Sequence, residues 1–141
     1  MKRILVLALL LAAMPVGSAS SASQGVLHVA PETVKFGVKS VGSSTFKGAT
    51  IKNASSSTVN LIVTVSRSPD DFGFVIPPTT CPVFDPAPLA PGESCDAVMR
   101  FSPSEFFAGL DQLAQLQAQA TDPATGAVLD TVLIDFTGRG K

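Results

Sequence analysis

The chain has 141 residues and a formal net charge of -1, and its length suits a single domain. Its Lys and Arg residues are scattered along the sequence, which argues against a nucleic-acid partner because such binding requires a basic patch. Eleven Gly, eleven Pro and nine Phe, with no Trp or Tyr and 45% hydrophobic residues, indicate a folded domain of short strands and many turns rather than a helical bundle.

The first predicted element is an N-terminal targeting segment. Lys2 and Arg3 precede an apolar run over residues 4–13, and residues 14–23 are small and polar. This order is typical of a secretory signal peptide. The apolar run is too short to cross a bilayer comfortably, since about 20 apolar residues are needed.

We therefore expect a signal peptide over residues 1–22, with small residues that allow cleavage after Ala19 or Ala22. An uncleaved membrane anchor is the alternative. Residues 23–141 then form one exported domain, secreted or periplasmic, with no membrane span after cleavage.

Short β-segments follow one another as far as residue 76. Apolar and polar residues alternate as in half-buried strands, and Gly, Ser, Asn and Pro signals separate the segments. The predicted segments are residues 25–29, 34–37, 47–53, 58–66 and 72–76. In the fourth, Val59, Leu61, Val63 and Val65 share one face, whereas Phe46, just before the third, is out of phase with the apolar residues that follow it.

A proline-rich connection spans residues 77–94 and holds six of the eleven prolines. Because proline removes backbone donors, no central strand is expected there. The only two cysteines are Cys81, inside the connection, and Cys95, just after it. An even number of cysteines in an exported chain favours a disulfide, which contributes about 3 kcal/mol for a loop of this length in the chain-entropy model. Two cysteines fourteen apart fit neither a four-ligand zinc site nor a Cys-x-x-Cys redox pair.

The C-terminal third contains one ambiguous segment between two predicted strands. Residues 95–101 and 130–137 alternate as strands do. Residues 105–120 combine helical spacing of Phe106, Leu110 and later apolar residues with a run of alternating alanines. We expect a strand there, because a gap in the sheet would expose unpaired edges.

Three stretches carry a resemblance to a known family. The first is Val-Lys-Phe-Gly-Val at 34–38, with Val-Gly-Ser-Ser at 41–44 and Ile-Lys-Asn at 51–53. The second is Leu-Ala-Pro-Gly-Glu-Ser-Cys at 89–95, running into Met-Arg-Phe-Ser-Pro at 99–103. The third is Phe-Thr-Gly-Arg-Gly at 136–140. Together they resemble ASH domains, named for abnormal-spindle and hydin proteins, and the bacterial choice-of-anchor D modules, over about residues 27–140.

ASH domains are similar in turn to major sperm protein and PapD-like immunoglobulin folds. The resemblance implies an all-β, immunoglobulin-like sandwich of seven antiparallel strands with one disulfide, used as a binding or spacer module and not as an enzyme. The paired cysteines lie where bacterial members often carry a pair. No cofactor is implied.

The residues themselves offer little catalytic chemistry. His28 is the only histidine, and its place beside Leu27 and Val29 indicates an exposed or edge-strand side chain rather than a general base. Asp70 and Asp71 follow a proline, as turn residues do. We therefore expect no catalytic, cofactor-binding or metal-binding residues.

The leading hypothesis is a protein-interaction or structural module of the cell envelope or the cell exterior. Its partner is then another envelope or extracellular protein, contacted by loops or an edge strand. The candidate contacts are Phe46, Phe84, Phe106 and Phe107, although core packing is the favoured interpretation of the last two. A self-assembling, pilus-like or surface-structure subunit is the alternative, and a secreted hydrolase is a third possibility.

Overall fold

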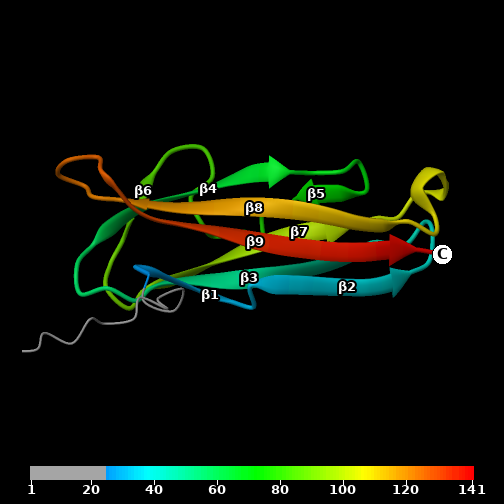
Figure 1. Ribbon diagram of the computed structural model, residues 1–141, viewed down its shortest axis with the longest axis horizontal. Coiled ribbons are helices and arrows are strands. Elements are labelled where there is room, and N and C mark those ends of the chain that lie inside the picture. The colour runs from blue at the N-terminus through cyan, green and yellow to red at the C-terminus, as the bar shows by residue number, and fades with distance from the viewer. Residues whose placement is uncertain (1–24) are drawn as a thin grey trace, which may run out of the picture.

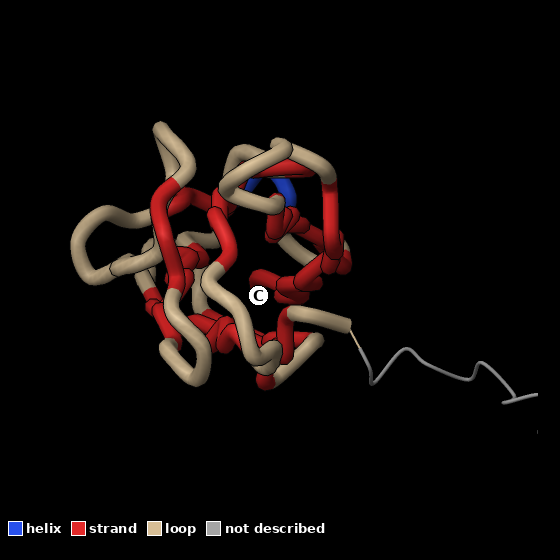
Figure 2. Tube along the Cα trace, turned by 90° about the vertical axis from the view of Figure 1, so that its left-hand side faces the viewer, coloured by secondary structure: helices blue, strands red, loops and turns tan. Residues whose placement is uncertain are grey.

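The alternating segments form two β-sheets that pack face to face in the computed structural model, which describes residues 25–141 (Figures 1 and 2). The first sheet has the order β1-β3-β7-β5. It consists of β1 (Leu27–Ala30), β3 (Thr45–Asn53), β7 (Ser94–Phe101) and β5 (Phe72–Phe74).

The second sheet has the order β2-β9-β8-β4-β6. It consists of β2 (Thr33–Lys39), β9 (Val128–Gly140), β8 (Asp111–Thr121), β4 (Val59–Arg67) and β6 (Ala87–Leu89). A single 3-10 turn, η2 (Glu105–Phe107), lies between β7 and β8. The expected signal peptide, residues 1–22, lies outside the described residues.

The expected all-β sandwich is confirmed, with two differences in detail. Residues 25–141 form nine strands rather than seven, and β5 and β6 have only three residues each. The pairing is antiparallel except between β2 and β9, which run parallel. The parallel pair arises because the chain leaves the first sheet after β1 and enters the second sheet as an edge strand, beside the last strand of the chain.

Inward-facing residues of both sheets meet in one apolar core. Four of the nine phenylalanines form its centre, and Phe101 contacts two of them, with ring centroids 4.7 Å from Phe72 and 5.5 Å from Phe36. Phe136 adds a ring 6.5 Å from Phe36. Burial of such rings is the main source of stability in a small sandwich.

The ambiguous segment forms a turn followed by a strand. Residues 105–107 form η2, and β8 then buries four alternate side chains completely: Ala114, Leu116, Ala118 and Ala120. The strand prediction is therefore confirmed over 111–121. Tertiary pairing with β4 and β9 on both sides overrides the helix-forming composition.

One local prediction was wrong and another holds. Val65 was expected to share the inner face of β4, but it is 45% exposed because the register shifts between Val65 and Arg67. The prediction that the proline-rich connection contains no central strand holds, because the strand that it contains, β6, is an edge strand. That strand is compatible with Pro88 because it lies at the edge of the second sheet and pairs only with β4.

Candidate functional site

The four candidate contact phenylalanines lie at different depths and on two parts of the surface. Phe106 and Phe84 are each 84% exposed, Phe46 is 54% exposed, and Phe107 is half-buried. The expectation that Phe106 packs in the core was wrong, because η2 lies outside the sandwich and buries none of its residues. The out-of-phase position of Phe46 does place it on the outer face of β3.

The turn η2 lies beside the C-terminus at one end of the molecule (Figure 1), and three large apolar residues lie on it or soon after it. We call Phe106, Phe107 and Leu110 the aromatic tip. The rings of Phe106 and Phe107 meet edge to face with centroids 4.8 Å apart, and Leu110 is 57% exposed. A cluster of large apolar side chains in water, unlike a single exposed one, is typical of a contact surface.

Backbone hydrogen bonds hold this turn against the end of the chain. Leu110 N–H donates to the Phe107 carbonyl at 3.1 Å, and Gly109 N–H donates to the Gly140 carbonyl at 2.9 Å. Gly109 has a φ of 82°, a left-handed conformation that glycine adopts without strain. The tip therefore has a defined position relative to β9.

A buried carboxylate fixes the base of the tip. Asp71 is 5% exposed, and its Oδ2 accepts hydrogen bonds from Gln112 Nε2 at 2.8 Å and from Ser104 N–H at 3.2 Å. Its backbone carbonyl accepts from Ser102 N–H at 2.8 Å. Burial alone would raise the pKa of Asp71, but the bonds from Gln112 and Ser104 outweigh it and hold the pKa below the ordinary value of 3.8. Asp71 thus ties the β4–β5 turn to both ends of the β7–β8 connection.

Replacing Asp71 with Asn is expected to lower the free energy of unfolding by about 1–3 kcal/mol at pH 7, because the neutral amide oxygen accepts these two bonds more weakly than the ionised carboxylate oxygen does. The depressed folded-state pKa means that the ionised group stabilises the fold above the unfolded-state pKa. This contribution is lost as the pH falls through the lower, folded-state pKa. Urea unfolding from pH 7 down to pH 2 should therefore show wild type and variant converging below about pH 4.

The neighbouring Asp70→Asn is the matched control for that experiment. Asp70 is exposed and makes no side-chain hydrogen bond among the described residues. Its replacement should change stability by less than about 0.5 kcal/mol at every pH. Equal losses in the two variants would contradict the assigned role of Asp71.

Next to the tip, a shallow hollow of about 620 Å³ opens on the outer face of the second sheet. It is lined by Lys35, Gly37 and Val38 of β2, Thr137, Gly138 and Arg139 of β9, and Asp111, Gln112 and Leu113 of β8. We call it the glycine-floored hollow. Gly37 lies at a register shift with a φ of 73°, and a Cβ there would have no atom within 4 Å, so no side chain covers this part of the hollow.

The fold gathers basic residues around this end. Six of the eight Lys and Arg residues of 25–141 lie on strand segments or chain ends here: Lys35, Lys39, Lys47, Arg100, Arg139 and Lys141. Four acids lie at the same end: Asp70, Asp71, Glu105 and Asp111. Arg139 and Asp111 approach to 3.6 Å, but both side chains are well exposed, so the pair adds little stability. The basic excess borders an apolar surface, an arrangement suited to an apolar partner with acidic flanks.

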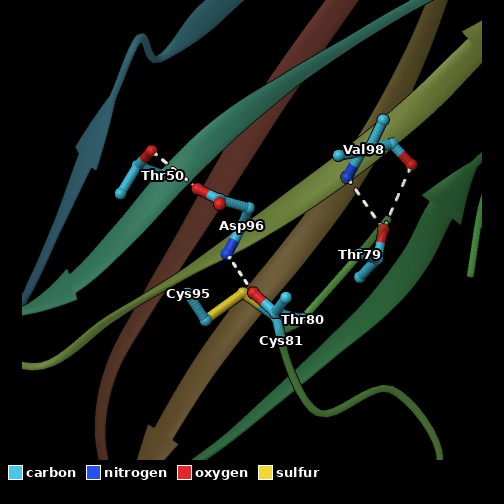
Figure 3. Close-up of a disulfide and its surroundings, with 7 residues drawn as sticks. All are labelled: Thr50, Thr79, Thr80, Cys81, Cys95, Asp96 and Val98. Atoms are coloured by element: carbon cyan, nitrogen blue, oxygen red, sulfur yellow. Dashed lines mark hydrogen bonds between the residues drawn. A yellow bond between two sulfur atoms is a disulfide. The ribbon is translucent and has the colours of Figure 1, made fainter. Parts of the chain in front are cut away.

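The two cysteines form the expected disulfide (Figure 3). It ties the connection between β5 and β6 to β7. The amides of Asp96 and Val98 donate to the hydroxyls of Thr80 and Thr79 at 2.8 Å and 2.9 Å, so this connection covers the open edge of β7. Phe84 lies on the same connection, away from the aromatic tip.

The remaining candidate groups stand apart from one another. His28 is exposed on edge strand β1, as expected. Within residues 25–141, no cluster of three or more His, Cys, Asp or Glu side chains is arranged to hold a metal ion. The same part of the chain contains no helix with the length and apolar character needed to cross a bilayer.

Comparisons with known proteins rest on structure. No family model and no curated protein sequence matches the chain. The ASH / PapD-like domain of human CEP192 superposes with a TM-score of 0.64 at 9% identity, covering 82% of this chain and 85% of that one. WR4, a C. elegans MSP family member, gives 0.53 at 13% identity over 83% and 99% of the two chains.

The E. coli chaperone DraB gives a TM-score of 0.55 at 16% identity, with 81% of this chain covered. This chain spans about half of the chaperone, 54% of its length. The molecule is therefore an immunoglobulin-like β-sandwich. More particularly, its fold is that shared by ASH, PapD-like and MSP domains; at these identities the likeness establishes the fold alone.

Proposed function

We propose that the chain is an exported, non-catalytic interaction module whose partner protein binds the end formed by the aromatic tip and the glycine-floored hollow. The observation that carries the proposal is the aromatic tip, where Phe106 and Leu110 are exposed and Phe107 is half-buried, held in place by Gly109 and the buried Asp71. Exposing such side chains costs solubility and adds nothing to the core, so a contact role accounts for them.

Export is supported by the charged and apolar leader sequence and by the disulfide, which persists in oxidising compartments. The mass of the protein purified from the cells that produce it tests this part. We expect a chain that begins at Ser20 or Ser23. A chain that keeps residues 1–19 would contradict export by cleavage.

Two equally exposed phenylalanines offer a matched test of the contact surface. Phe106 and Phe84 are both 84% exposed, but they lie on different connections. A photocrosslinking residue at position 106, in the native envelope, should capture one other polypeptide. The same residue at position 84 should capture little.

Phe106→Ser should correspondingly reduce co-purification of the captured polypeptide by at least about tenfold, the loss expected for an aromatic anchor. Phe84→Ser should leave it unchanged. Capture from position 84 alone would move the contact to the connection between β5 and β6 and overturn the proposed surface.

A further inference from the structure

The end opposite the aromatic tip carries a second apolar protrusion. It is the β8–β9 hairpin, visible at the other extremity of the sandwich (Figure 1). Val128 is 58% exposed and Leu129 is 45% exposed. Pro123, Ala124 and Ala127 are exposed beside them, and the segment is bounded by Asp122 and Asp130.

Local hydrogen bonds give this protrusion a fixed shape. Asp122 N–H donates to the Ala127 carbonyl and Gly126 N–H donates to the Asp122 carbonyl, both at 2.8 Å. Asp130 Oδ2 accepts from Leu27 N–H at 2.9 Å. The hairpin is therefore an ordered apolar knob with a carboxylate on each side.

The two ends of the molecule differ in charge as well as in shape. Asp122, Asp130 and Glu93 lie at the hairpin end, where Lys52 is the cation. The tip end has a basic excess, and its largely apolar hollow is lined by Lys35, by Arg139 and by Asp111, which pairs with Arg139, so its rim carries a net positive charge. The chain thus carries both halves of a complementary contact on its opposite ends, an apolar hollow with a net positive rim and an apolar knob with acidic flanks.

We infer that the β8–β9 hairpin of one copy docks into the glycine-floored hollow of the next, so that a second copy of this chain is one partner of the end assigned above. This inference rests on the proposed function, since it uses the same end. Val128 and Leu129 occupy the hollow, and Asp122 and Asp130 face Lys35 and Arg139. Because the two contact surfaces are different, the association is head to tail and extends into chains unless its rotation closes a ring.

Sedimentation of the mature protein over a concentration series measures this association. We expect assembly that grows with concentration and a dissociation constant that rises roughly tenfold from low to high salt, because the flanking charges are screened. Two variants with exposed substitutions block one surface each: Val128→Ser/Leu129→Ser on the hairpin and Val38→Glu/Arg139→Glu at the hollow. Unchanged thermal unfolding of both variants shows that each retains the fold.

Mixing the two blocked variants gives the decisive result. Each alone should be monomeric, whereas an equimolar mixture should form a dimer and nothing larger, because each copy retains one intact surface. A mixture that stays monomeric, or a single variant that still assembles, overturns the inference.

The inference can also fail separately from the proposed function. A wild-type chain that is monomeric at every concentration, yet crosslinks through position 106 to a different protein, removes the second copy as partner and leaves the interaction module in place. Absence of any crosslinked polypeptide from position 106 contradicts the proposed function itself.

Discussion

Replacing Phe101 with Ala is expected to lower the free energy of unfolding by about 3–5 kcal/mol, the usual cost of removing a fully buried aromatic ring. The side chain has no exposed surface and stacks on Phe72 at 4.7 Å. It also packs against the backbone of Gly138, since a Cβ there would lie 2.7 Å from the Phe101 ring. The ring therefore joins the two sheets, and equilibrium urea unfolding measures its loss.

The exposed Phe46→Ala serves as the control, because it removes the same atoms from a residue that pairs with the neighbouring position on β7. It should cost less than about 1 kcal/mol. If Phe101→Ala also costs less than about 1 kcal/mol, the core has collapsed into the cavity, and the assigned packing is contradicted.

The contact with Gly138 makes a second, coupled test. Gly138→Ala alone should destabilise by about 1–3 kcal/mol, because the added methyl group overlaps a ring that the core holds in place. In the Phe101→Ala background the same substitution should cost much less, since the ring is gone. A double-mutant cycle with no coupling would show that the cost at position 138 has another origin.

Much of the fold could be predicted because each strand of a sandwich carries its own alternation of apolar and polar residues in the local sequence. Alternation in β7 placed Cys95, Ala97, Met99 and Phe101 on one face, and all four are buried. In β8 alternation competed with helical spacing, and the argument that a gap would expose unpaired sheet edges correctly favoured the strand. The exposed position of Phe46 also followed from its phase.

The elements that the sequence left open depend on contacts between distant residues. The parallel pairing of β2 with β9 and the exposure of Val65 follow from sheet order and register, which alternation does not encode. Core packing was the favoured interpretation of Phe106, whereas the structure places it on a turn outside both sheets. The basic residues are scattered in sequence, and only the meeting of β2, β3, β7 and β9 at one end concentrates them.

The candidate site was likewise predicted only in part from the sequence. Sequence singled out the exposed phenylalanines but missed the hollow, whose floor depends on the positive φ of Gly37 opposite Gly138 of a strand about a hundred residues away. Asp71 was correctly assigned to a turn. Its partner Gln112 could not be identified, because it is one of four glutamines in an alternating segment and nothing in the sequence marks it as the one that faces inward.

Replacing both cysteines with Ser is expected to lower the free energy of unfolding by about 3 kcal/mol, since the disulfide no longer restricts the unfolded chain. Both positions are almost fully buried, so two hydroxyl groups in the core add to the loss. The wild type treated with reductant should show the loss due to the bond alone, because thiols and not hydroxyl groups then occupy these positions. Reductant should have no effect on the double variant, which makes it the internal control.

The region that opens first in the reduced protein shows whether the disulfide holds the connection locally or contributes only to global stability. Cys81 lies on the connection that covers the edge of β7, and the hydroxyls of Thr79 and Thr80 accept from the amides of Val98 and Asp96. In the reduced protein, hydrogen exchange should accelerate at these two amides before it does at Ala114 and Leu116 in the centre of β8, because the connection opens locally while the core persists. Uniform acceleration across both sheets would show instead that the disulfide acts only through global unfolding, and that the two threonines hold the connection without it.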